Sequence, residues 1–394
     1  MSKDSIVITS AVRTPIGALQ GVFSPLSAAD LGAAASREAI AKSNLNGQEI
    51  DEVLFGCVLP AGLGQAPARQ VAIHAGLDKS TPCTTISKVC GSGMKAVMLG
   101  YEMIKAESCQ RVLVGGMESM TNAPYMIPKA RAGLRFGHGE IIDHMLYDGL
   151  QDAYEHESMG VYAQRMADKL GITREQMDDF AITSLRRAKQ ATESGYFEDE
   201  IVPVTVASRK GSLCVEQDET PQKVNEDKIP SLKPSFAKDG TVTAANSSSI
   251  SDGAAALVVM KASDAKTRGL QPLVEIKAIA GHAQQPDEFT IAPIAAINKL
   301  LDKVGWTVAD VDLFEINEAF AMVTMAAINA LDLDPEKVNV NGGACALGHP
   351  IGATGARIIV TLIHALKRLG KTRGVACLCI GGGEATAVAI EVCE

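Results

Sequence analysis

Residues 84–93 read Thr-Thr-Ile-Ser-Lys-Val-Cys-Gly-Ser-Gly, and the residues after them place apolar side chains at helical spacing. This order predicts a short strand, a tight glycine turn and a helix in succession. Cys90 falls in the turn, at or just before the expected start of the helix. A strand that feeds a helix through a short turn is the building unit of α/β proteins.

The second half of the chain repeats this order. A strand is expected at residues 338–340, a glycine-rich turn at 341–355 and then a helix, whose apolar residues include Ile358, Ile359 and Leu362. The elements around this order also correspond in the two halves. In the first half we expect a helix at 30–42, a strand at 53–60 and a later apolar strand, ending in glycines, at 112–116. Their counterparts in the second half are expected at 293–304, 311–317 and 375–381. Two copies of one βαβ-type unit would explain the repetition and predict an α/β fold.

A different region, from about residue 121 to 249, separates the two halves. It is rich in charged and turn-forming residues, and an amphipathic helix is expected at residues 176–193. We interpret it as an insertion that covers one face of the first half and binds a ligand or forms a subunit contact. The alternative is an insertion with a structural role only.

Composition limits the classes of function. The 394 residues, 46% of them hydrophobic, predict at least two packed units. A net charge of −9 argues against general nucleic-acid binding, which needs clustered cations. The apolar runs are strand-length and no leader pattern is recognisable, so a soluble, cytoplasmic protein without a membrane partner is expected. Nine cysteines without a CxxC pair indicate free thiols in a reducing compartment and no metal site.

Cys90 is the first candidate for chemistry. Backbone N–H groups and the dipole at the start of a helix favour a thiolate, and flanking glycines allow a substrate to approach the backbone closely. The alternative is a small buried hydrophobic residue. The location favours a nucleophile.

Three further residues stand at similar places in the pattern. His349 lies between Gly348 and Pro350 just before a helix, where it could activate a thiol, or act only as a loop or capping residue. Cys379 ends an apolar strand before three glycines and could transfer a proton. Asn317 follows a strand and could hold a water for an oxyanion, or cap a helix. No GxSxG elbow and no P-loop are present in the sequence.

The ordered motifs resemble those of the thiolase family over essentially the whole chain, and most closely its acetyl-CoA acetyltransferase branch. The matching stretches are residues 7–17, 88–96, 115–122, 241–256, 317–320, 341–357 and 379–383. The resemblance implies two similar βαβαβαββ halves, packed as five layers α-β-α-β-α, with an inserted loop domain. It implies a first half of residues 1–120 plus 249–271, an inserted domain of residues 121–248 for coenzyme A binding and oligomer contacts, and a second half of residues 272–394.

The resemblance also implies a role for each candidate. Cys90 is similar to the nucleophile that becomes acylated, and His349 to its base and a donor to the first oxyanion hole. Asn317 is similar to the residue that holds the water of that hole, and Cys379 to the acid/base for the second substrate. The backbone of Cys90 and Gly381 forms the second oxyanion hole in such enzymes. The contacts implied for the pantetheine arm and the acyl group are Ser248, Ala244, Met159, Phe289 and Phe320.

The implied reaction is the reversible Claisen condensation of two acetyl-CoA molecules to acetoacetyl-CoA and coenzyme A through acyl-Cys90. Coenzyme A thioesters would be substrates, no cofactor would be bound permanently, and a homotetramer is expected. A 3-ketoacyl-CoA thiolase of fatty-acid β-oxidation is the alternative, and the bulk of Phe289 favours short acyl groups. A ketoacyl-synthase-type enzyme fits less well because Cys379 is present, and a non-catalytic carrier because all four groups are. Leu185 stands where a potassium-dependent relative has Tyr, so no potassium requirement is predicted.

Overall fold

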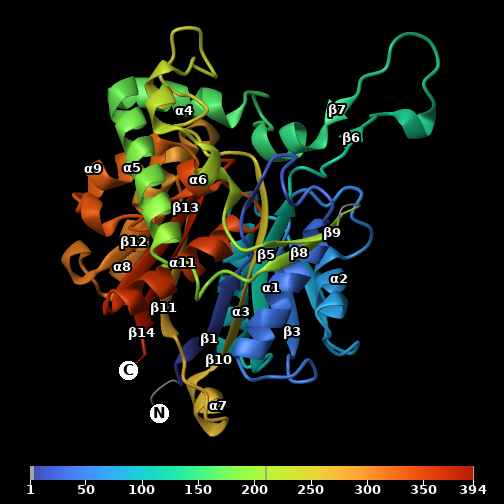
Figure 1. Ribbon diagram of the computed structural model, residues 1–394, viewed down its shortest axis with the longest axis vertical. Helices are drawn as coiled ribbons and strands as arrows, with labels where there is room; N and C mark the ends of the chain where they lie inside the picture. Colours follow the sequence, from blue (N-terminus) through green and yellow to red (C-terminus); the bar gives the residue numbers. More distant parts are fainter. Residues whose placement is uncertain (1–3, 209–210, 394) are drawn as a thin grey trace.

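The computed structural model describes residues 4–208 and 211–393, and its first half supplies six strands and three long or medium helices around one sheet (Figure 1). Capping fixes where helices begin: the Ser27 hydroxyl accepts a hydrogen bond from the Asp30 backbone N–H, and the Asp30 carboxylate accepts one from the Ser27 N–H. The elements are β1 (Ile6–Arg13), β2 (Gly17–Ala18), α1 (Ala28–Lys42), β3 (Glu52–Gly56), α2 (Pro67–His74), β4 (Cys83–Ile86), α3 (Ser92–Lys105), β5 (Arg111–Ser119), β10 (Ser251–Lys261) and the short α7 (Ala262–Thr267).

The elements between β5 and β10 add no strand to the main sheet within the described residues. They form two small two-stranded sheets and the helices at the upper left of Figure 1. They are β6 (Tyr125–Met126), η1 (Ala130–Ala132), β7 (Ile142–Asp143), η2 (Met145–Leu150), α4 (Met159–Leu170), α5 (Arg174–Glu193), β8 (Val204–Ser208), β9 (Gly211–Val215), α6 (Glu219–Lys223) and η3 (Glu226–Ser231).

The second half repeats the order of the first with four strands. Its elements are β11 (Val274–Ala283), η4 (Pro286–Ile291), α8 (Ala292–Val304), η5 (Val308–Asp310), β12 (Leu313–Ile316), α9 (Ala321–Leu331), η6 (Pro335–Lys337), α10 (Ala344–Leu347), α11 (Thr354–Arg368), β13 (Arg373–Ile380) and β14 (Glu384–Val392). The main sheet runs β12-β13-β14-β11-β1-β10-β5-β3-β4, with β2 beside β10. Val7 and Ile8 pair with Glu275 and Val274, so the strands of the two halves join through β1 and β11.

The predicted α/β class and five-layer arrangement are confirmed. One apolar cluster packs α3 and α11 between the two halves of the sheet, a second packs α1 and α2 on one outer face, and a third packs α8 on the other. Figure 1 shows α1 and α2 on the right, α8 and α9 on the left, and α3 and α11 between them. Among the described residues, no helix combines the length and the apolar character that a membrane crossing requires.

The prediction of a strand at residues 338–340 is wrong, because only Val338 forms a β-bridge there, with Phe314. The backbone of Asn339 is left-handed, with φ at 49°. Its side-chain amide accepts from the Ile316 N–H and donates to the Ile316 carbonyl, each at 2.8 Å. A side chain thus takes the hydrogen bonds that a neighbouring strand would otherwise make.

The two central helices meet at their N-termini, where glycines permit close contact. A Cβ on Gly93 would lie 2.8 Å from the backbone nitrogen of Ala356, and one on Gly355 would lie 2.4 Å from the backbone nitrogen of Met94. Gly93 and Gly355 are each the second residue of their helix. The turn before α3 and the loop before α11, which carry Cys90 and His349, are therefore held at the same place in the molecule.

Candidate active site

A cavity of about 420 Å³ brings together most of the residues singled out in the sequence. Eight of the ten predicted site residues line it: Cys90, His349, Gly381, Ser248, Ala244, Met159, Phe289 and Phe320. They come from the first half, the insertion and the second half, so the cavity exists only in the folded chain. Asn317 and Cys379 are not part of its lining, but both side chains are buried.

Cys90 lies in a strained turn between β4 and α3. Val89, directly before it, has φ at 44°, which is an outlier for a β-branched residue and a cost that the surrounding fold has to sustain. Burial raises the pKa of the Cys90 thiol to about 11, and the backbone N–H groups of Gly381 and Cys90 act in the opposite direction. The helix start therefore does not leave a thiolate at rest, contrary to our expectation, and the thiol needs a base.

His349 lines the same cavity and has one ring nitrogen free. Its Nδ1 lies 2.6 Å from the Thr354 hydroxyl oxygen, and that hydroxyl donates to the Pro350 carbonyl at 3.0 Å. Because the hydroxyl hydrogen is used there, Thr354 accepts a hydrogen from Nδ1, and Nε2 carries the free lone pair. Nε2 is buried without a partner among the described residues. Burial, followed by the charge of Arg357, lowers the pKa of His349 to about 3, so the imidazole is neutral.

Asn317 has a buried side chain whose Nδ2 and Oδ1 both lack a protein partner among the described residues. It does not cap a helix, because α9 begins later and has Phe320 at its N-cap. Its backbone N–H donates to the Cys377 carbonyl at 3.0 Å, which continues the β12–β13 ladder and fixes its position. A buried amide in this state requires water or ligand partners.

Cys379 is fully buried near the end of β13 and packs in one apolar cluster with Phe289 and Phe320. Burial raises the pKa of its thiol far above the ordinary value, and negative charge on Cys90 raises it further. The two cysteines thus act on each other electrostatically, and their segments are in contact, since a Cβ on Gly91 would lie 2.4 Å from the Ile380 side chain. Ionisation of one thiol therefore opposes ionisation of the other.

One side of the cavity is largely apolar. Phe289 is buried, and the Phe236 ring meets the Phe320 ring edge-on with centroids 6.1 Å apart. Gly160 lies under Phe236, because a Cβ at that position would come within 2.3 Å of the ring. Sequence reasoning missed several lining residues of the insertion and neighbouring loops, since no periodic pattern marks them: Leu146, Leu150, Phe236, Ile250 and Ile351.

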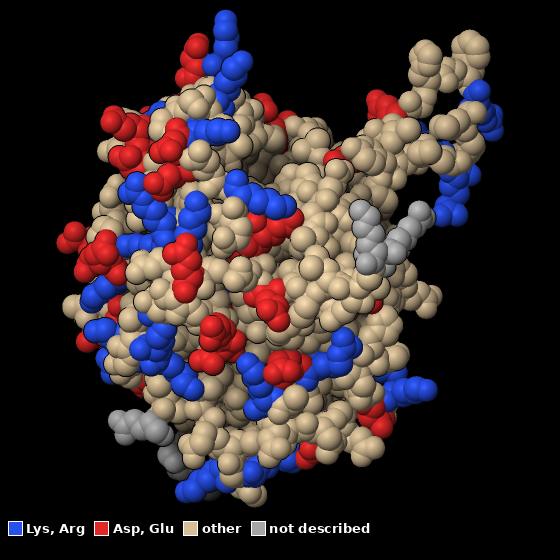
Figure 2. Space-filling view, in the orientation of Figure 1, with Lys and Arg blue, Asp and Glu red and all other residues tan. Residues whose placement is uncertain are grey.

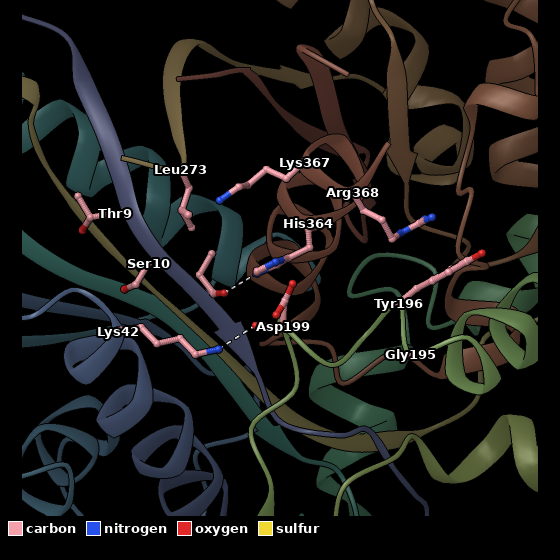
Figure 3. A pocket seen from close by; sticks show the side chains of 11 residues that line it. Thr9, Ser10, Lys42, Gly195, Tyr196, Asp199, Leu273, His364, Lys367 and Arg368 are labelled. Carbon is pink, nitrogen blue, oxygen red and sulfur yellow. Dashed lines mark hydrogen bonds between the residues drawn. The ribbon is translucent and has the colours of Figure 1, made fainter. Parts of the chain in front are cut away.

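A second hollow, of about 540 Å³, lies at the end of α11 (Figure 3). It contains the cations Lys42, Lys367 and Arg368 but no thiol. Figure 3 shows that their charged ends diverge: Lys367 points toward Leu273 and Arg368 toward Tyr196, while Lys42 donates to the Asp199 carbonyl at 2.8 Å. The groups do not converge on one point as in a built binding site. No cluster of metal-ligating side chains occurs in the described part of the chain.

Family models match both halves of the chain. A model described as "Thiolase, N-terminal domain" covers residues 6–263, and one described as "Thiolase, C-terminal domain" covers residues 270–392. The chain belongs to the thiolase family. This thiolase is 49% identical to an acetyl-CoA acetyltransferase of Escherichia coli over 98% of each chain.

Solved structures agree with this result. A crystal structure of a thiolase from Ascaris suum in complex with coenzyme A superposes with a TM-score of 0.94 at 43% identity, over 99% of this chain and 100% of that one. The acetyl-CoA acetyltransferase of Bacillus anthracis superposes with a TM-score of 0.97 at 42% identity, over 99% of each chain. The predicted thiolase fold is therefore confirmed for this chain.

Proposed function

We propose that this thiolase is an acetyl-CoA C-acetyltransferase that condenses two acetyl-CoA molecules reversibly to acetoacetyl-CoA and coenzyme A. The observation that carries the proposal is the pairing, in one cavity, of a protonated nucleophile and a neutral imidazole with a free Nε2. A second buried thiol near the first supplies the proton chemistry that carbon–carbon bond formation requires. The acetyl-CoA acetyltransferases among the relatives support the choice of substrate.

In the first half-reaction, His349 Nε2 takes the proton of Cys90, and the thiolate attacks the thioester carbonyl of acetyl-CoA. The oxyanion accepts hydrogen bonds from protonated Nε2 and from a water held by the free amide of Asn317. The C–S bond to coenzyme A breaks, His349 returns the proton to the leaving thiolate, and acetyl-Cys90 remains. Nε2 can donate to the oxyanion only after it has taken the proton, so the two roles of His349 follow in order.

In the second half-reaction, Cys379 acts as a thiolate, which forms before the first turnover by loss of the thiol proton to solvent. This thiolate removes a proton from the methyl group of a second acetyl-CoA. The enolate carbon attacks acetyl-Cys90, and the N–H groups of Cys90 and Gly381, which already act on the Cys90 sulfur, stabilise the oxyanion. The C–S bond breaks to give acetoacetyl-CoA and the Cys90 thiolate. Cys379 then passes its proton to Cys90, so one proton is shared between two sulfurs that resist joint ionisation.

The decisive experiment is a mass measurement on the Cys90 peptide after brief incubation with acetyl-CoA. An acetyl adduct on this peptide, lost again on addition of coenzyme A, is the expected result. Absence of the adduct, or its location on another cysteine, contradicts the proposal. The buried Phe289 favours short chains, and faster thiolysis of a long 3-ketoacyl-CoA than of acetoacetyl-CoA would instead favour the β-oxidation enzyme.

We further propose a homotetramer, with contacts made by the arm formed by residues 124–143. The arm extends away from the body, and most of its surface in Figure 2 is uncharged. Its large apolar side chains are exposed, and Phe136 is completely accessible. The apolar residues concerned are Tyr125, Ile127, Leu134, Phe136 and Ile141. Replacing Leu134 and Phe136 with Ser should lower the mass measured by light scattering, and an unchanged mass contradicts the assignment.

The compartment and the internal division are also part of the proposal. All nine cysteines are unpaired, as is usual in a reducing compartment, which supports the cytoplasm. We propose that residues 1–120 with 249–271 and residues 272–394 are the two halves, and that residues 121–248 are the inserted domain. The return of β10 to a place between β1 and β5 supports this division.

A further inference from the structure

Glu118 is a fully buried carboxylate near Cys90 that no step of the proposed reaction uses. It lies near the end of β5 and contacts only hydrogen-bond donors. Its Oε2 accepts from the backbone N–H of Val58 at 3.0 Å and of Gly352 at 2.9 Å. Its Oε1 accepts from the N–H of Leu59 at 3.1 Å and from the Cys57 thiol at 3.6 Å. An ionised carboxylate suits these partners, because a protonated one would leave a donor facing donors.

These partners belong to both halves of the molecule. Val58 and Leu59 follow β3 in the first half, whereas Gly352 is in the second-half loop that carries His349. Gly352 has no room for a side chain, since a Cβ would lie 2.5 Å from Glu118 Oε2. Val58, Leu59 and Ile351 form one apolar cluster with Met120, and Cys90 packs against it. One carboxylate therefore connects the loop after β3, against which Cys90 packs, with the loop that carries His349.

The charge of Glu118 also acts on Cys90. Burial raises the pKa of Glu118 to about 7, against the opposing effect of the N–H groups of Val58, Leu59 and Gly352. The titratable groups that face it are the thiols of Cys57 and Cys90, and its negative charge raises the pKa of both. The described residues place no salt-bridge partner on Glu118, so this charge is not neutralised by a cation.

We propose that Glu118 is a positioning residue, which sets the distance between Cys90 and His349 by holding the loops of both halves on one carboxylate. The inference rests on the proposed reaction, in which proton transfer from Cys90 to His349 Nε2 requires hydrogen-bond distance. A shift of either loop by about 1 Å is enough to lower the rate about 10²-fold.

Glu118→Gln keeps the shape but replaces one acceptor oxygen with a donor. Either the N–H groups of Val58 and Gly352 or the N–H group of Leu59 then lose their acceptor. We expect kcat for thiolysis of acetoacetyl-CoA to fall about 10²-fold, with KM for coenzyme A within about threefold of wild type. At pH 8, iodoacetamide should alkylate Cys90 at least about threefold faster, because the nearby negative charge is gone. A chain that was merely less stable would also expose other buried thiols, so alkylation of the buried Cys377 is measured in the same sample and should stay at the wild-type rate.

Glu118→Asp separates position from charge, because it keeps the charge but is one methylene shorter. Its kcat should fall at least about tenfold while alkylation stays at the wild-type rate. Asp252→Asn is the matched control: Asp252 is also buried, on β10 beside β5, but it holds the Thr121 N–H and neither catalytic loop. We expect its kcat within about threefold of wild type.

The inference is overturned if Glu118→Gln, corrected for the fraction of chains that form the acetyl adduct, retains kcat within threefold of wild type. It is also overturned if the Gln and Asp variants change alkylation alike. A wild-type chain that cleaves no acetoacetyl-CoA would instead contradict the proposed function, and the alkylation rates would still decide whether Glu118 acts on Cys90.

Discussion

The turn before α3 and the loop before α11 occupy equivalent places in the two halves of the molecule. Each helix begins with a hydroxyl residue followed by glycine, Ser92-Gly93 and Thr354-Gly355. Each hydroxyl donates to a backbone carbonyl just before the helix, that of Val89 at 2.7 Å or that of Pro350 at 3.0 Å. The repeat has thus placed two similar helix starts against each other.

The two hydroxyls differ in what they accept. Ser92 accepts the Lys88 backbone N–H at 2.8 Å and so closes the strained turn around Cys90. Thr354 accepts Nδ1 of His349 and so sets the tautomer of the base. The hydroxyl at the start of α3 therefore fixes the backbone of the Cys90 turn, and the hydroxyl at the start of α11 fixes the side chain of His349. In the proposed reaction, one repeated unit thereby supplies both the nucleophile and the group that deprotonates it.

The largest expected effect comes from removal of the nucleophile in the first turn. Cys90→Ser should lower kcat at least about 10³-fold and abolish the acetyl adduct, because a hydroxyl is much harder to deprotonate than a thiol. Turnover is measured by acetoacetyl-CoA thiolysis and the adduct by peptide mass. Cys214→Ser, which alters an exposed thiol in β9, is the control and should keep kcat within about twofold. An adduct on another residue of the Cys90 variant would refute the roles assigned to the two helix starts.

Loss of the second thiol should separate the half-reactions. Cys379→Ala is expected to lower kcat for condensation at least about 10²-fold, since it removes the acid/base. Formation of the acetyl adduct on Cys90 should stay within about fivefold of wild type, because His349 alone serves that step. The comparison of adduct formation with turnover is made on the same sample. If Cys379→Ala abolishes the adduct as well, the thiol acts on Cys90 rather than on the second substrate.

How much of this site could be predicted depends on whether the signal is local. The glycine-rich turns before two helical patterns pointed to Cys90 and His349, which both line the cavity, and a strand that ends in glycines pointed to Cys379, which is buried outside its lining. The partner of His349 could not be inferred this way, because Thr354 acts through side-chain geometry. Glu118 was missed for the same reason, since its partners are backbone groups of residues far away in the sequence.

The fold shows the same limit. The helices expected at 30–42, 176–193 and 293–304 begin within two residues of α1, α5 and α8. The short helix α10 was missed, because it lies inside the run 341–355 that was expected to be a turn. The strand expected at residues 338–340 failed because the Asn339 side chain takes over the hydrogen bonds of the ladder, which no propensity predicts. The strain at Val89 was equally invisible, since a valine in a left-handed conformation is against its own preference.

The buried imidazole predicts a pH dependence of stability. The pKa of His349 is about 3 in the folded chain and about 6.5 for an unperturbed histidine. A lowered folded-state pKa gives stability that is fully present above 6.5 and is lost as the pH falls toward 3. Between pH 8 and pH 5 this loss amounts to about 2 kcal/mol. The free energy of unfolding, measured by urea titration at pH 8 and at pH 5, should therefore change by about 2 kcal/mol less in His349→Gln than in wild type. An equal change in the two proteins contradicts a neutral buried imidazole.

The smallest expected effect compares the two hydroxyls directly. Thr354→Val keeps the shape but removes the acceptor of Nδ1, so the tautomer of His349 is no longer fixed. We expect kcat to fall about tenfold, less than for complete loss of a general base, because the imidazole itself remains. Ser92→Ala removes only backbone contacts and should lower stability by about 1 kcal/mol, with kcat for the folded enzyme within about threefold. Chemical denaturation and thiolysis are measured on both variants. A hydroxyl with a purely structural role should change the fraction of folded enzyme but not the rate of the folded enzyme. If Ser92→Ala lowers kcat as much as Thr354→Val does, the two hydroxyls do not have the different roles assigned to them here.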